Sequence, residues 1–212
     1  MDPQFYHAAM EGDIEVIKEK RPDELDGLLT PRKNTVLHIH ISARPEKMES
    51  TQFLQEVLDM CRPSLVFQAN SKGDTPLHIE ARYGLDGVVE VLDHTKSLDQ
   101  LESGYKQMLW VTNNEKDTAF HEAVRMNHID VVRLLICEDP EYSYSANVAG
   151  ETPLYLAVER EHKDIAFEIL GECTSLAHGG PNGRTTLHAA VIKKYKGTYI
   201  LFLLLLLLVS FN

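Results

Sequence analysis

The stretch Gly73-Asp74-Thr75-Pro76-Leu77-His78 predicts the start of a short helix. Thr75 suits the N-cap position, and Pro76 suits the first helical position, where no backbone donor is needed. His78 lies three residues after the cap, so its side chain can reach back to the N-cap backbone, as Glu or Gln does in a capping box. The segment therefore indicates a turn that leads directly into a capped helix.

The same device recurs along the chain at nearly regular intervals. The further copies are Thr35-Val36-Leu37-His38, Thr118-Ala119-Phe120-His121, Thr152-Pro153-Leu154-Tyr155 and Thr185-Thr186-Leu187-His188, with a degenerate copy at Pro3-Gln4-Phe5-Tyr6. An aliphatic segment suited to a second helix follows most copies, such as Val131, Val132 and Leu135 after Thr118. A motif of this kind with a period near 33 residues is the signature of ankyrin repeats, each a turn plus two helices.

The fold expected from this pattern is all-α. It is an ankyrin-repeat solenoid of helix-turn-helix repeats with β-hairpin-like tips, with about five full repeats and a truncated sixth. The repeat domain is expected over residues 1–192, followed by a basic and then leucine-rich hydrophobic tail over residues 193–212. The residues expected to set the repeat geometry are Thr35, His38, Thr75, Pro76, His78, Thr118, His121, Thr152, Pro153, Thr185 and His188.

Composition and motifs argue against an enzyme. The net charge of −11 argues against nucleic acid as a partner, which requires a basic surface. The segment 121–125 begins like a zinc-protease helix but has Arg125 where the second histidine ligand must lie. No metal, cofactor or catalytic residue is therefore predicted. The scattered Cys61, Cys137 and Cys173 suggest reduced thiols in a cytosolic setting, although Cys137 or Cys173 as a nucleophile stays open.

A more specific resemblance rests on residues 34–39, 73–78, 111–118 and 183–191. These segments resemble plant ankyrin-transmembrane proteins of the accelerated-cell-death class. In that family an N-terminal ankyrin array precedes a multi-helix membrane domain and takes part in defence signalling. The resemblance covers residues 1 to about 192 and implies a protein–protein interaction scaffold in plant defence or stress signalling. This chain departs from the family after that point, where the array is cut short and no multi-span domain follows.

The tail has two open interpretations. Residues 200–209 are ten consecutive apolar residues, which span about 15 Å as a helix against roughly 30 Å of hydrocarbon. The segment is either a truncated or mis-spliced end, or an interfacial anchor assisted by Lys193, Lys194 and Lys196. The second interpretation makes the chain a membrane-tethered signalling regulator. The expected location is cytoplasmic, or the cytoplasmic face of the plasma membrane if the tail binds lipid.

A partner protein is expected on the concave face, which hairpin tips and the solvent ends of the first helices form in ankyrin arrays. Arg, Tyr and Met at these positions are residue types that interface hot spots favour. The alternative for each residue is an ordinary solvated surface. The predicted partner-binding residues are Lys72, Asp74, Arg82, Tyr83, Glu115, Asp117, Arg125, Met126, Glu151, Glu159 and Arg160.

Three local expectations also follow when the repeats are aligned on their capping threonines. The truncated last repeat is expected to leave Ile165 and Ile169 exposed, since terminal repeats need a polar outer face. Trp110 is expected to plug a small cluster with Tyr105, Met108 and Leu109 rather than to lie exposed. His40 and Glu80 occupy the same slot of adjacent repeats, where alanine is usual, and are expected to form a hydrogen bond or ion pair.

Overall fold

The computed structural model describes residues 1–43, 50–60, 64–84, 87, 91–92, 96, 103–141, 144–174 and 176–193. The chain divides into two compact units, Met1–Asn114 and Glu115–Asn212. Within the described ranges the regular elements are helices, and one isolated antiparallel bridge joins Gly179 to Thr185. The all-α prediction is therefore confirmed.

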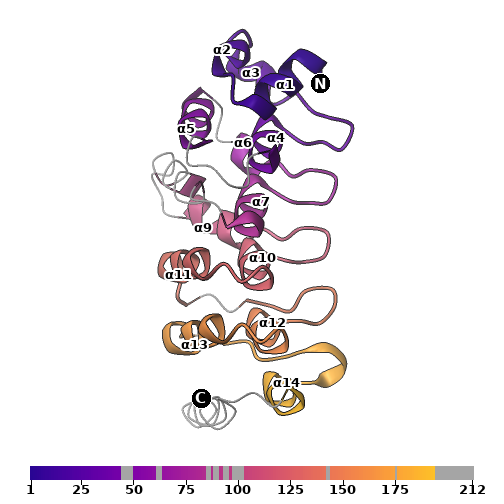
Figure 1. Ribbon diagram of the computed structural model, residues 1–212, viewed down its shortest axis with the longest axis vertical. Coiled ribbons are helices and arrows are strands. Elements are labelled where there is room, and N and C mark those ends of the chain that lie inside the picture. Colours follow the sequence, from indigo (N-terminus) through magenta and orange to yellow (C-terminus); the bar gives the residue numbers. More distant parts are fainter. Residues whose placement is uncertain are drawn as a thin grey trace. The chain divides into compact units, whose positions relative to one another are not determined.

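In the first unit, three capped helices form a row. They are α1 (Pro3–Glu11), α4 (Val36–Ala43) and α7 (Pro76–Tyr83), and α4 packs against both of the others (Figure 1). The remaining helices of this unit are α2 (Ile14–Ile17), α3 (Pro22–Leu25), α5 (Ser50–Met60), α6 (Ser64–Phe67) and α9 (Ser103–Trp110). Helix α5 contacts α2 and α4, so second-row helices cover one side of the first row.

In the second unit, two helical hairpins stack in parallel. Helix α10 (Ala119–Arg125) pairs with α11 (Ile129–Glu138), and α12 (Pro153–Glu159) pairs with α13 (Lys163–Glu172). Helix α12 also packs against α10 and against α14 (Thr186–Ile192), while α11 packs against α13. Figure 1 shows this unit as one row of first helices and one row of second helices, with long loops on the opposite side. A short 3₁₀ turn, Pro181–Gly183, lies in the last of these loops.

The first helices end at residues with left-handed backbone conformation. Gly84 has a φ of 69° after α7, and Asn127 has a φ of 63° after α10. Asparagine is one of the few residues other than glycine that adopts this conformation routinely. Glu161 takes the same role after α12 with a φ of 61°, although glutamate is less suited to it.

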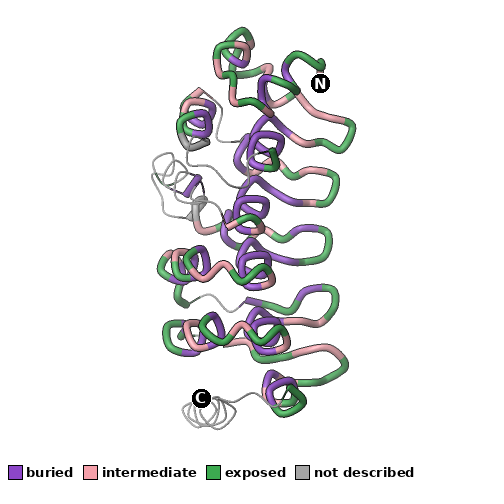
Figure 2. The backbone as a smooth tube through the Cα atoms, viewed as in Figure 1, coloured by how far each residue is buried: buried purple, intermediate pink, exposed green. Residues whose placement is uncertain are grey.

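The core lies on the inner faces of the helices, as the buried stretches of the tube in Figure 2 show. The residue two places after the capping threonine is almost completely buried in four of the five helices, as Leu37, Leu77, Phe120 and Leu154, and Leu187 of α14 is partly exposed. Burying a side chain of this size stabilises the fold by roughly 1.5–3 kcal/mol. The repeating motif therefore provides both the helix start and the main apolar contact of each first helix.

Two of the local expectations are wrong. Ile165 and Ile169 are buried, because they lie four residues apart on the side of α13 that packs against α12 and α11. Trp110, at the end of α9, is 39% exposed, whereas Met108 and Leu109 of the same helix are buried. These two residues fill the interior position that the sequence assigned to the tryptophan.

The third expectation stays a prediction. His40 and Glu80 are both completely buried, so neither side chain points to solvent. The ring of His40 stacks on Phe53 with centroids 4.1 Å apart, and its Nδ1 donates to the carbonyl oxygen of Ala9 at 3.0 Å. The side chain of Tyr105 and the tail beyond Lys193 lie outside the described residues.

Candidate protein-binding surface

The threonine–histidine pairs form capping boxes. In α10 the backbone N–H of Thr118 donates to Nδ1 of His121 at 3.2 Å, and the two side chains lie 2.9 Å apart. The pairs at Thr35, Thr75 and Thr185 repeat this arrangement. Because Nδ1 accepts from a backbone N–H, the ring proton belongs on Nε2. These four histidines therefore cap the starts of their helices.

The other ring nitrogen connects neighbouring repeats. Nε2 of His38 donates to the carbonyl oxygen of Asp74 at 2.8 Å, so the capping histidine of one repeat holds the loop of the next. Burial lowers the pKa of His38, although the Asp74 carbonyl opposes the shift. Burial lowers the pKa of His121 to about 4, against smaller opposing effects that include the carbonyls of Glu151 and Ser145. Both imidazoles are therefore neutral at physiological pH.

The loops that precede the capping threonines are joined by an asparagine ladder. The side-chain amide of Asn70 donates to Oδ1 of Asn34 at 3.1 Å, and the amide of Asn113 donates to Asp74 at 2.9 Å. In the second unit, the amide of Asn147 donates to Asp117 at 2.9 Å. We call these three contacts the asparagine ladder. The sequence carried a signal for it, since each asparagine lies five residues before a capping threonine.

Backbone hydrogen bonds run parallel to the asparagine ladder. The N–H of Ser71 donates to the carbonyl of Arg32 at 2.8 Å, and that of Asn114 donates to Lys72 at 3.0 Å. In the second unit the N–H of Val148 donates to Glu115 at 2.8 Å. Within each unit, successive loop tips are therefore held in a fixed register by main-chain and side-chain contacts together.

Two predicted partner-binding carboxylates belong to this internal network. Asp74 accepts a hydrogen bond from Arg82 at 3.0 Å, and Asp117 forms an ion pair with Arg125 at 2.8 Å. Burial alone would raise the pKa of each carboxyl group, but the hydrogen bonds from arginine and asparagine outweigh it and lower the pKa overall. Both aspartates are buried. The prediction that Asp74 and Asp117 form part of the exposed surface is therefore wrong.

The other predicted residues lie at or near the surface. Tyr83 is 39% exposed and Met126 is 45% exposed. Arg82 and Arg125 are more covered, because each reaches back to its aspartate. The remaining members are Lys72, Glu115 and Arg160, which are exposed, and Glu151 and Glu159, which are partly exposed.

One position is exposed in each repeat that begins with a capping threonine. The residue eight places after the capping threonine is exposed in every described repeat, and its chemistry changes from one repeat to the next. These residues are Ala43, Tyr83, Met126, Arg160 and Lys193. We call this set the +8 positions. They contrast with the capping threonines and histidines and the ladder asparagines, which fix the backbone and are the same residue types in successive repeats.

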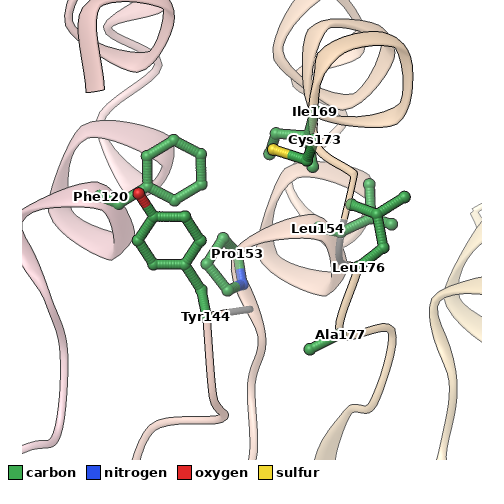
Figure 3. A pocket seen from close by; sticks show the side chains of 8 residues that line it. All are labelled: Phe120, Tyr144, Pro153, Leu154, Ile169, Cys173, Leu176 and Ala177. Atoms are coloured by element: carbon green, nitrogen blue, oxygen red, sulfur yellow. The ribbon is translucent and has the colours of Figure 1, made fainter. Parts of the chain in front are cut away.

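A small, partly open pocket lies in the second unit. Its lining includes Phe120, Tyr144, Leu154 and Cys173, and its volume of about 10 Å³ is that of a single water molecule (Figure 3). The rings of Phe120 and Tyr144 stack with centroids 4.2 Å apart. Burial raises the pKa of the Cys173 thiol to about 11, so it stays protonated and is a poor nucleophile.

The described residues offer neither a metal site nor a membrane-spanning helix. Among the described residues there is no group of three or more His, Cys, Asp or Glu side chains that could hold a metal ion. None of the helices in the described ranges is long and apolar enough to cross a bilayer. The predicted anchoring role of residues 193–212 stays a prediction, since all of this segment except Lys193 lies outside these ranges.

Comparison with known proteins agrees with the geometry. The sequence model "Ankyrin repeats (many copies)" matches residues 120–167. The crystal structure of an ankyrin repeat domain from Acinetobacter baumannii superimposes with a TM-score of 0.71, covering 96% of each chain at 20% sequence identity. This chain has the ankyrin-repeat fold. The capping boxes and the asparagine ladder thus hold its ankyrin repeats in register.

Proteins with similar sequences come from a plant, an insect and a human. Protein ACCELERATED CELL DEATH 6 of Arabidopsis thaliana is 25% identical over 179 residues, which is 80% of this chain and 26% of that protein. The NF-kappa-B inhibitor cactus of Drosophila melanogaster is 23% identical over 124 residues, which is 49% of this chain and 25% of that protein. Human transient receptor potential cation channel subfamily A member 1 is 27% identical over 157 residues, which is 73% of this chain and 12% of that protein. The chain thus spans about a quarter or less of the length of these relatives.

Proposed function

We propose that the chain is a non-catalytic scaffold whose second unit binds another protein through its +8 positions, Met126, Arg160 and Lys193, and the adjoining loop tips. The single observation that carries this proposal is the contrast described above. The +8 side chains are exposed and varied, while the backbone that presents them is fixed by repeated internal contacts. A rigid frame with variable exposed side chains suits recognition, because little conformational entropy is lost when a partner binds.

The residue types at the +8 positions also suit a protein partner. Tyr83, Met126 and Arg160 are a tyrosine, a methionine and an arginine, and these types are enriched at protein interfaces. Methionine is adaptable and makes a good contact for apolar side chains. Ankyrin repeats generally mediate binding to other proteins, which supports the same role for this chain.

We propose plant defence or stress signalling as the setting. The support is the similarity to Protein ACCELERATED CELL DEATH 6, which extends over most of this chain. The similarity falls on the ankyrin repeats themselves, so it concerns the scaffold and not the remaining three quarters of that protein.

Photo-crosslinking from chosen positions tests the proposed surface. A photoreactive amino acid at Met126, or separately at Arg160, is expected to capture the same discrete protein from plant extracts. The matched control carries the same probe at Arg133, which is exposed on α11, in the second row of helices. Met126→Glu in the chain that carries the probe at Arg160 is expected to abolish capture. Equal capture from Arg133, or capture unaffected by Met126→Glu, would exclude this surface.

A further inference from the structure

The loop before Thr185 differs from the other loop tips. Two consecutive residues, Asn182 with a φ of 57° and Gly183 with a φ of 73°, have left-handed backbone conformation. The N–H of Arg184 donates to the carbonyl of Pro181 at 3.1 Å, and the N–H of Gly180 donates to the carbonyl of Arg184 at 2.8 Å. Positive φ at both central residues defines a type I′ turn, for which Asn-Gly is the preferred sequence.

The Asn182 side chain is exposed, and no hydrogen bond from it is seen in the described part of the chain. The space where a β-carbon of Gly183 would lie is also open, with no atom within 4 Å. The asparagines of the asparagine ladder are different, because their side-chain amides donate to a neighbouring repeat. Asn182 is also the sole asparagine in the sequence that precedes a glycine.

We propose that Asn182 is a site of spontaneous deamidation in the folded protein. The backbone nitrogen of Gly183 loses its proton to a base and attacks Cγ of Asn182. The bond between Cγ and the side-chain nitrogen breaks, ammonia leaves, and a five-membered succinimide remains. A water molecule then opens the ring at one of its two carbonyls and gives aspartate or isoaspartate. Water is consumed and ammonia is released, so no oxidant or reductant is required.

Three features of the turn favour this reaction over the same reaction elsewhere. Gly183 has no side chain to obstruct the attack, and both reacting groups are open to solvent base. The backbone at Asn182 must leave its left-handed conformation before the nitrogen can reach Cγ. This local opening disrupts few contacts, because the exposed turn contributes no buried apolar side chain.

The product would change the chemistry of this loop tip. A carboxylate at position 182 adds negative charge close to Arg184, which is exposed. Isoaspartate in addition inserts one carbon into the main chain, and this is incompatible with the hydrogen bond between Arg184 and Pro181. Deamidation would therefore alter both the charge and the shape of the last described loop.

Peptide mapping by mass spectrometry tests the proposal on the full chain, incubated folded in mildly alkaline and in mildly acidic buffer. We expect replacement of the amide nitrogen by oxygen at position 182, faster in the alkaline buffer, with both aspartate and isoaspartate products. The internal control is Asn114, which is exposed but whose amide donates to the carbonyl of Ser71 at 3.1 Å. Product at Asn182 is expected to exceed product at Asn114 by roughly tenfold or more.

Asn182→Gln is the matched variant, because cyclisation of glutamine would require a larger ring and is slow. It is expected to remove the product, while circular dichroism and thermal unfolding verify that it folds like the parent chain. Comparable product at Asn114 and Asn182 would overturn the proposal, as would product that forms after denaturation but not in the folded chain. Mass is the required measurement, since an isoaspartate assay alone would also detect rearranged Asp26-Gly27 or Asp86-Gly87.

Discussion

Asp117 and Arg125 close an ion pair of 2.8 Å across the two ends of helix α10. The aspartate lies just before the capping threonine, and the arginine is the last helical residue. Asp74 and Arg82 form the same contact around α7, with the same spacing of eight residues. An acidic group near the N-terminus and a basic group near the C-terminus also complement the helix dipole. The pair therefore stabilises each short helix and fixes the carboxylate that accepts from the asparagine ladder.

A double-mutant cycle on this pair is expected to show strong coupling. Asp117→Ala leaves the largely buried guanidinium of Arg125 without its main partner, and Arg125→Ala leaves a buried carboxylate. Each is expected to cost about 2–4 kcal/mol, below the full range for buried pairs because Arg125 retains some exposure. Chemical denaturation of the two single variants and the double variant measures the coupling. Additive losses would contradict the expectation.

The pair of Asp117 and Arg125 makes the stability of the fold depend on pH in the acidic range. The pKa of Asp117 is lowered in the folded chain, because the hydrogen bonds from Arg125 and Asn147 outweigh the effect of burial. Its contribution is therefore fully present above the ordinary aspartate pKa of about 3.9 and is lost as the pH falls through the lower folded value.

His121 is expected to make the fold sensitive to milder acid. Burial lowers its pKa to about 4 in the folded chain, whereas an exposed histidine titrates near pH 6.5. Between these values the unfolded chain takes up a proton that the folded chain does not, so stability falls as the pH falls. Urea unfolding at several pH values across this window measures the slope. His121→Gln should flatten the slope, and an unchanged slope would assign the effect to other groups such as His38.

Gly180 and Gly179 form a matched pair for testing the contact with Tyr155. A β-carbon on Gly180 would overlap the ring of Tyr155, whereas a β-carbon on Gly179 would meet nothing within 4 Å. Gly180→Ala is expected to destabilise the second unit by about 1–3 kcal/mol, as for an overpacked core. Gly179→Ala is expected to change stability by less than about 0.5 kcal/mol. Thermal unfolding measures both, and equal effects would show that the ring moves aside freely.

The predicted pairing of His40 with Glu80 can be tested in the same way. Both side chains are completely buried, so removing one member leaves a buried polar group behind. His40→Ala and Glu80→Ala are expected to be less than additive in a double-mutant cycle at neutral pH. His40→Phe is the control for packing, because it keeps a ring against Phe53. Additive losses would indicate that each residue acts through separate contacts.

The local pattern predicted the helix starts because their contacts lie within four residues. Thr118 and His121 meet wherever the chain turns into a helix, so the motif alone was sufficient. The buried state of Asp117 could not be predicted in this way, since it depends on Asn147 from the next repeat. Trp110 was misplaced for a related reason. The sequence shows an apolar run at the end of α9, but which of these residues faces the interior depends on packing.

The asparagine ladder has a consequence for how such a chain can lengthen or shorten during evolution. The repeats that begin at Thr75 and Thr118 each bring a donor, five residues before the threonine, and an acceptor, one residue before it. Excision or duplication of one such repeat would therefore rejoin a donor to an acceptor and leave no orphaned amide at the junction. A break inside a repeat would separate the two halves, so genetic exchange at repeat boundaries is the change that this architecture tolerates.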